Sequence, residues 1–106
     1  MDKEQVRRVT KQFASSIDTD MHVRKVVLYG SWVDGQPHED SDIDVAVVVR
    51  ECKSDFLDLL TKLYQIASLV DVRIEPNLFE EDRDADDGFL SHILARGEIV
   101  YEQDGV

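Results

Sequence analysis

The sequence has few of the residues that build disulfide scaffolds, zinc sites or membrane spans. It contains one cysteine, Cys52, and two prolines among 106 residues. A single cysteine excludes an internal disulfide framework and a cysteine-rich zinc site. The longest unbroken apolar run is Val45–Val49, far short of the ~20 residues of a membrane-spanning helix. The N-terminal residues also lack the apolar core of a secretory signal. We therefore expect a soluble, cytoplasmic protein that has no transmembrane span and does not bind a membrane.

Basic residues are also scarce. The chain has 12 Lys and Arg against 23 Asp and Glu, which gives a formal net charge of −11. A protein that binds long nucleic acids on its own usually presents a basic face to the phosphates. We expect no direct binding to long nucleic acids, and attraction to basic partners instead. A nucleotide bound by this chain would have to be held locally, by metal ions or backbone amides.

The remaining composition is that of a folded domain. Hydrophobic residues make up 42% of the chain and charged residues 33%, so burial of a core is expected and disorder is not. There are no internal repeats or low-complexity linkers. The length predicts one domain over residues 1–106.

Three segments have apolar residues spaced three and four apart, the pattern of a helix with one buried face. The first runs from Lys3 to about Asp18, the second opens at Ser54 and Asp55, and the third is Gly88–Arg96. The third helix is expected to end at Gly97. The side chains of this helix that we expect to face the core are Phe89, Leu90, Ile93 and Leu94.

Four short segments are expected to form strands: Lys25–Tyr29, Ile43–Val49, Val70–Glu75 and Ile99–Tyr101. Ile43–Val49 is apolar on both faces after Asp44, which is typical of a central strand covered on both sides. Val70–Glu75 alternates apolar and polar residues, and the following proline is expected to close it. The order of elements predicts an α/β (α+β) domain in which helices pack on a small mixed sheet.

Two aspartates stand out among the many acidic residues. Asp42 and Asp44 open the most apolar predicted strand, where period-two geometry points both side chains to one face, ~6.6 Å apart along the backbone. Two like charges so near a core are costly unless a cation neutralises them. Oxygen ligands suit a hard divalent cation such as Mg²⁺. Without a second feature, these residues would be read as two solvated acids at a strand start.

The second feature is Gly30-Ser31, at the end of the preceding predicted strand. Glycine lets the backbone approach a ligand closely, and the serine hydroxyl with the following N–H groups can donate to phosphate oxygens. A phosphate-binding turn beside a metal-binding pair is what phosphoryl or nucleotidyl transfer requires. The combination favours a functional reading of the two aspartates over the structural one.

Gly30-Ser31, ten intervening residues and Asp42-Ile43-Asp44 form the pattern G-S-x10-D-x-D. The segment GSWVDGQPHEDSDIDVAVV resembles the minimal nucleotidyltransferases of the DNA polymerase beta superfamily. The following helix, the segment Val70-Asp71-Val72 and the ending HILARGEIVYE are also similar to that family. The resemblance covers nearly the whole chain and implies a nucleotidyltransferase fold.

The resemblance also implies roles for individual residues. The two motif carboxylates, Asp42 and Asp44, would bind two Mg²⁺ ions. Asp71 matches the third family carboxylate, which helps to activate the attacking hydroxyl, and Glu75 is its rival on the same predicted strand face. The residues implied to bind the nucleotide are Gly30 and Ser31 at the phosphates, Gly35 at the end of the phosphate loop and Ser41 before the first aspartate.

The implied activity is transfer of a nucleoside monophosphate, AMP from ATP, to a hydroxyl. Minimal members of the family often pair with a small helical HEPN-domain protein, in some cases as an antitoxin that adds AMP to a toxin tyrosine. The acidity of this chain suits such a partner. Two alternatives stay open: a nucleotide-binding module without catalysis, which masks its partner by contact, and a homo-oligomer of structural role.

One departure from the family pattern favours the inactive module. Many relatives carry an arginine just before the second glycine of the loop, and this chain has Asp34 there. An acidic residue in place of a phosphate-facing cation weakens nucleotide binding. Arg24, Lys25 and Arg73 are the candidates for a compensating charge.

Overall fold

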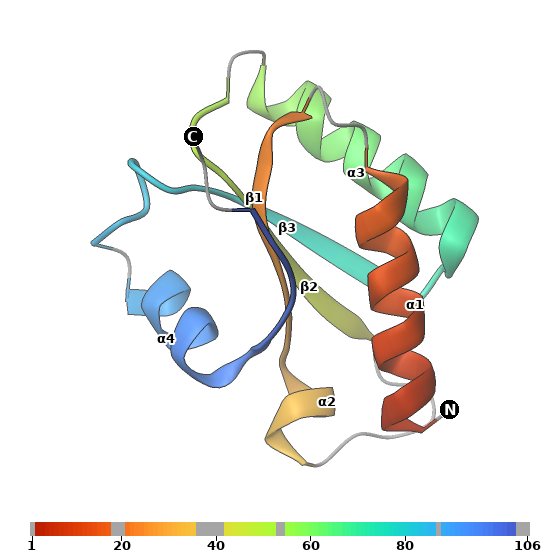
Figure 1. The fold of residues 1–106 in the computed structure, drawn as a ribbon. Helices are drawn as coiled ribbons and strands as arrows, with labels where there is room; N and C mark the ends of the chain where they lie inside the picture. The colour runs from red at the N-terminus through yellow and green to blue at the C-terminus, as the bar shows by residue number, and fades with distance from the viewer. Residues whose placement is uncertain (1, 18–20, 36–41, 53–54, 87, 104–106) are drawn as a thin grey trace.

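The computed structural model describes residues 2–17, 21–35, 42–52, 55–86 and 88–103. Helices and strands alternate along the chain (Figure 1). The elements are α1 (Lys3–Ser16), β1 (Val23–Tyr29), α2 (Ser31–Asp34), β2 (Ile43–Val49), α3 (Phe56–Val70), β3 (Ile74–Glu80), α4 (Gly88–Arg96) and β4 (Glu98–Glu102).

The strands form one mixed sheet in the order β3-β2-β1-β4. β1 is antiparallel to both β2 and β4, whereas β2 and β3 are parallel. The mixed sheet confirms the predicted fold class. β2 is central, and all of its residues except Asp44 are buried, as its apolar sequence predicts.

Helices α1 and α3 lie together over one face of the sheet (Figure 1). α1 begins with a capping box in which Asp2 and Gln5 exchange side-chain to backbone hydrogen bonds, an arrangement that satisfies free amides of the first turn. The core on this face combines side chains of both helices with every second residue of the strands. Its fully buried members include Val6, Phe13, Leu28, Val45, Val47, Val49 and Leu63.

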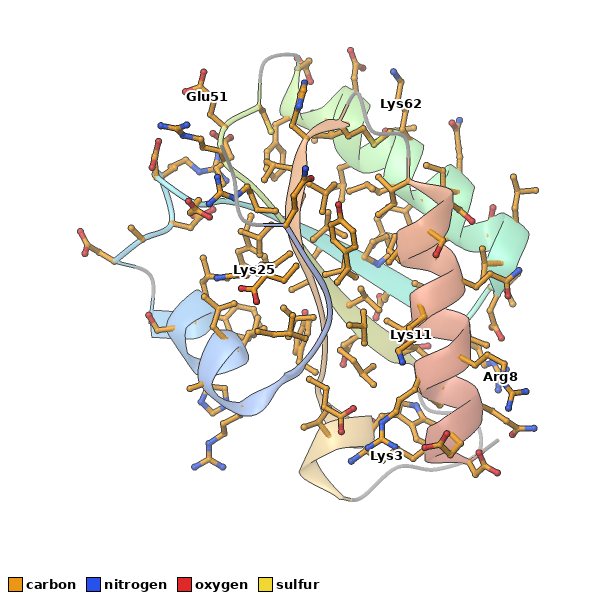
Figure 2. All side chains as sticks on the ribbon, in the orientation of Figure 1. Lys3, Arg8, Lys11, Lys25, Glu51 and Lys62 are labelled. Carbon is orange, nitrogen blue, oxygen red and sulfur yellow. The ribbon has the colours of Figure 1, made fainter. Side chains whose placement is uncertain are left out.

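Helix α4 covers the opposite face, and its side chains reach toward the sheet (Figures 1 and 2). The core there is smaller and consists of Val27, Ala46, Val48 and Phe79 of the sheet with Leu90 and Ile93 of the helix. Because side chains alternate along a strand, residues two or four positions from these on the same strand share the same face. Tyr29, Asp44 and Glu75 are such residues, and they bring polar groups to the end of this face.

The predicted strand Val70–Glu75 is wrong in its position. Val70 is the last residue of α3, and the strand runs over Ile74–Glu80 with Pro76 inside it. Proline is tolerated there because β3 is an edge strand in the described sheet, and an edge strand leaves half of its N–H groups unpaired. The apolar stripe of the helix continues to Val70, so the helical pattern prevails where the two patterns overlap.

Three smaller differences concern helix ends and side-chain burial. The short helix α2 was not predicted as an element. Asp55 caps α3 by accepting hydrogen bonds from the N–H groups of Leu57 and Asp58. Ser54, where the sequence also places the opening of this helix, lies outside the described residues. Phe89 was expected in the core but is 53% exposed.

No helix among the described residues has both the length and the apolar composition needed to span a bilayer.

Candidate active site

Three polar side chains lie in one row across the sheet, at the end near α2. Asp44 of β2 pairs in register with Tyr29 of β1 on one side and with Glu75 of β3 on the other. Paired residues on neighbouring strands point to the same face and lie within direct contact range of one another. Two carboxylates and a phenol therefore stand side by side on the α4 face.

The electrostatics of this row disfavour a charged Asp44. Burial of its carboxyl raises the pKa of Asp44, and the negative charges of Glu75 and then Asp42 raise it further. Among the described residues, no arginine, lysine or histidine has an ion pair with Asp44. The fold thus holds clustered acids without a compensating partner, an arrangement that favours binding of a cation.

Tyr29 contributes a neutral hydroxyl to the row. Its oxygen accepts a hydrogen bond of 2.7 Å from the side-chain amide of Asn77 on β3. Burial, and next the charge of Asp44, raise the pKa of Tyr29 to about 12. At neutral pH the phenol is protonated and adds no further negative charge.

The Gly30-Ser31 turn packs directly against Asp44. Gly30 has a φ of +82°, and a Cβ built on it would overlap the Asp44 carboxylate. Both observations require glycine here, since other residues rarely adopt this φ and none would fit beside the carboxylate. The Gly30 carbonyl accepts a hydrogen bond of 3.0 Å from the N–H of Val33, and Ser31 begins α2. The two halves of the G-S-x10-D-x-D pattern are therefore in contact.

The other residues predicted to belong to this part of the site are Asp42, Gly35 and Ser41. Asp42 is exposed and directly precedes β2. Gly35 ends α2 with a φ of +90°, and nothing lies within 4 Å of a Cβ built on it. Ser41 lies outside the described residues. The row of acids thus has Asp44 and Glu75 at its centre and Asp42 at its edge.

Asp71 does not open a strand as predicted. It is the C-cap of α3, and its backbone N–H donates to the carbonyl of Ala67. Its carboxylate accepts hydrogen bonds of 2.8 and 3.0 Å from the Arg73 guanidinium, and these bonds hold the pKa of Asp71 below its ordinary value. The residue that faces Asp44 from the neighbouring strand is Glu75.

The described residues do not form a complete metal site without a ligand. No three of the histidine, cysteine, aspartate and glutamate side chains described form a group that could hold a metal ion. In nucleotide sites, however, Mg²⁺ usually takes one or two carboxylates and completes its shell with water and substrate phosphates. Two adjacent carboxylates, with Asp42 beside them, are oxygen donors of the kind that such a shared site needs.

A cavity of about 180 Å³ opens next to this row. Tyr29 at the end of β1, Gly30 of the turn and Val33 of α2 line one side of it, and the other residues come from α4 and its end. These are Phe89, His92, Ile93, Arg96 and Gly97. The sequence pattern did not assign α4 to the site. The available signal was the spacing of Phe89, His92 and Arg96 by three and four, which places them on one helix face.

The family model described as polymerase beta, nucleotidyltransferase matches residues 11–105. The chain belongs to this nucleotidyltransferase family. The match includes both halves of the motif and all of the described site. No curated protein sequence matches this nucleotidyltransferase closely enough to extend the comparison.

Solved structures show the same fold. A protein from Sulfolobus solfataricus, assigned as a nucleotidyltransferase, superposes with a TM-score of 0.66 at 13% identity, over 95% of this chain and 84% of that one. A toxin–antitoxin solved with AMP-PNP gives 0.60 at 21% identity, over 98% of this chain and 76% of that one. A double Asp-to-Glu variant of the toxin–antitoxin MntA-HpeT gives 0.58 at 19% identity, with the same shares covered.

Proposed function

We propose that this nucleotidyltransferase domain transfers AMP from Mg²⁺-bound ATP to a hydroxyl group and releases pyrophosphate. The observation that carries the proposal is the contact between the Gly30-Ser31 turn and the carboxylate of Asp44, which pairs with Glu75 of the neighbouring strand. A phosphate-binding turn and a cation-binding pair then act on the same triphosphate.

In this proposal Asp42 and Asp44 bind the magnesium ions. Bound Mg²⁺ would neutralise the carboxylates together with the phosphates and polarise the reacting phosphorus. The raised pKa of Asp44 supports this role, because a carboxylate crowded by other acids is stabilised by a cation. Gly30 and Ser31 bind phosphate oxygens, with Gly35 at the end of the loop and Ser41 before the first aspartate.

For the third carboxylate the geometry favours Glu75 over Asp71. Glu75 pairs in register with Asp44, whereas Asp71 is already neutralised by Arg73 at the end of α3. In the transfer step, the acceptor oxygen bonds to the α-phosphorus and its proton passes to Glu75. The bond from that phosphorus to the β-phosphate oxygen breaks, and pyrophosphate leaves with the electron pair.

The acceptor we propose is a tyrosine hydroxyl of a small helical HEPN-type protein, with this chain as the antitoxin. Two of the similar structures are of toxin–antitoxin pairs, one of them with AMP-PNP. The net charge of −11 suits a basic partner.

The proposal is tested with ATP labelled on the α-phosphate, Mg²⁺ and the helical protein that co-purifies with this chain from its host. We expect the label on a tyrosine of the partner and one pyrophosphate released for each AMP transferred. The double variant Asp42→Asn/Asp44→Asn should give neither product. Equal labelling by the wild type and the double variant would contradict the proposal.

Asp34 favours a second candidate function, because it stands where many relatives carry arginine. A nucleotide-binding module without catalysis would bind Mg²⁺-bound ATP and the partner, but would release no pyrophosphate. The labelling experiment separates the two functions if ATP binding is measured in the same samples.

A further inference from the structure

The three basic residues expected to compensate for Asp34 all have acidic partners. Arg24 lies 3.8 Å from Glu81, and Lys25 lies 3.6 Å from Glu102. Arg73 is bound to Asp71 at 2.8 Å. Arg24 and Lys25 also lie near the start of β1, at the opposite end of the strand from Gly30. The triphosphate therefore needs another source of positive charge.

Helix α4 presents such a charge at the cavity beside Gly30. Arg96 lines this cavity, and His92 lines it one helical turn earlier. Both side chains are exposed. Neither has a hydrogen bond or ion pair with any other residue that the structure describes. Arg96 is thus an available cation at the edge of an otherwise acidic site.

The packing of α4 fixes where this cation lies. Leu90 and Ile93 are buried against the sheet. At the end of the helix, a Cβ on Gly97 would collide with the Val27 side chain and with the backbone of Leu28. The absence of a side chain at position 97 lets the last turn of α4 pack closely against β1, which places Arg96 beside the strand that Gly30 follows.

We propose that Arg96, assisted by His92, binds the terminal phosphates of the nucleoside triphosphate. Arg96 would supply the positive charge that is missing because Asp34 replaces the arginine of many relatives. This inference rests on the proposed function and deepens it. The cavity opens beside Gly30, where the phosphates are expected. Asp44 lies next to the cavity for the reacting α-phosphate, because it pairs with Tyr29 and packs against Gly30, which both line the cavity. A guanidinium group binds phosphate oxygens with two parallel hydrogen bonds. The same contact would stabilise the leaving pyrophosphate.

The test compares three ligands, each with Mg²⁺: ATP, pyrophosphate and AMP. Their affinities are measured by calorimetry for the wild type, Arg96→Gln and Arg96→Lys. Arg50→Gln is the matched control, since Arg50 is an exposed arginine beyond the far end of β2, ~20 Å along the strand from Asp44. Melting temperatures of all four proteins verify that they are folded.

We expect Arg96→Gln to weaken ATP and pyrophosphate binding by about tenfold or more, the effect of losing a hydrogen bond to a charged group. AMP binding should be unchanged, because AMP lacks the terminal phosphates. Arg96→Lys should bind ATP more tightly than Arg96→Gln, and Arg50→Gln should match the wild type. Wild-type affinity of Arg96→Gln for ATP and pyrophosphate, or an equal loss for AMP, would overturn the inference.

The outcomes also separate this inference from the proposed function. If Asp42→Asn/Asp44→Asn abolishes ATP binding and Arg96→Gln does not affect it, the role of Arg96 is wrong and the proposed function stands. If the wild type shows no metal-dependent ATP binding, both are wrong.

Discussion

The two faces of the sheet differ in what they bury. The face under α1 and α3 is closed by an apolar core that includes Phe13 and Leu63, both fully buried. The face under α4 has a smaller core and ends in the row of Tyr29, Asp44 and Glu75 beside a cavity. β2 contributes buried side chains to both faces, because alternate residues point to opposite sides of the sheet. The first face therefore only stabilises the fold, whereas the second combines a smaller core with clustered acidic groups that do not stabilise the fold.

Replacement of Glu75 should have the largest effect. Glu75→Gln removes the proposed proton acceptor beside Asp44, and we expect AMP transfer to fall by about a thousandfold, within the range for loss of a general base. ATP binding should change much less. The measurement is the rate of pyrophosphate release under saturating ATP.

Asp71→Asn is the matched comparison for Glu75→Gln. Its carboxylate is bound to Arg73 at the end of α3, so we expect near-normal transfer rates. A loss of transfer in Asp71→Asn, with normal transfer in Glu75→Gln, would reverse the assignment of the third carboxylate.

Truncation of the closed core should affect stability and not chemistry. Leu63 is fully buried on the face of α3 that packs on the sheet, and Leu63→Ala should lower the free energy of unfolding by about 3 kcal/mol. Leu57, on the same helix, is 67% exposed, so Leu57→Ala should change it by less than about 0.5 kcal/mol. Urea denaturation of both variants measures the difference. Equal effects would show that α3 does not bury the face assigned to it.

Gly30→Ala tests the contact between the turn and the carboxylate. The added Cβ would overlap Asp44, and the backbone φ of +82° would be strained. Displacement of the turn by about 1 Å is expected to lower transfer by about a hundredfold. Gly88→Ala is the control, because a Cβ at Gly88 meets nothing within 4 Å. Normal transfer by Gly30→Ala would show that close approach at this turn is not required.

The smallest effect concerns an ion-pair cluster outside the site. Arg7, and then Lys3, lower the pKa of Glu98 from 4.5 to about 2, which ties α1 to β4. A depressed carboxyl pKa contributes stability above pH 4.5 that is lost as the pH falls towards 2. Glu98→Gln should therefore lower the melting temperature by a few degrees at pH 7, and the difference from the wild type should shrink below pH 4.5. A difference independent of pH would exclude an electrostatic cause.

The local patterns predicted most of the fold. Helical spacing predicted α4 with its observed bounds, and a continuous apolar run did the same for β2. The G-S-x10-D-x-D spacing also indicated that the Gly30 turn lies beside Asp44, and the two residues are in contact. These features depend on residues close in sequence or on one motif, so they can be predicted from the sequence alone.

Features that depend on pairing between distant segments were not predicted. The partner of Asp44 depends on the register of β3 against β2, and period-two alternation alone did not distinguish Glu75 from Asp71. The place of Arg96 at the cavity depends on how closely Gly97 lets α4 approach β1. Neither register nor close approach has a local sequence signal.

The most direct test of the site is the melting temperature of the wild type and Asp44→Asn, each with and without Mg²⁺-bound ATP. Burial and neighbouring acids raise the pKa of Asp44 above 3.8, so its ionisation costs stability as the pH rises above 3.8. Without ligand at pH 7, Asp44→Asn should therefore melt at a higher temperature than the wild type, and this difference should vanish below pH 3.8.

Ligand at about 100 times its Kd should raise the wild-type melting temperature by roughly 10 °C and leave Asp44→Asn unchanged. That result would establish that the carboxylates destabilise the free fold and bind the magnesium nucleotide. A less stable Asp44→Asn that gains as much from the ligand as the wild type would contradict the account.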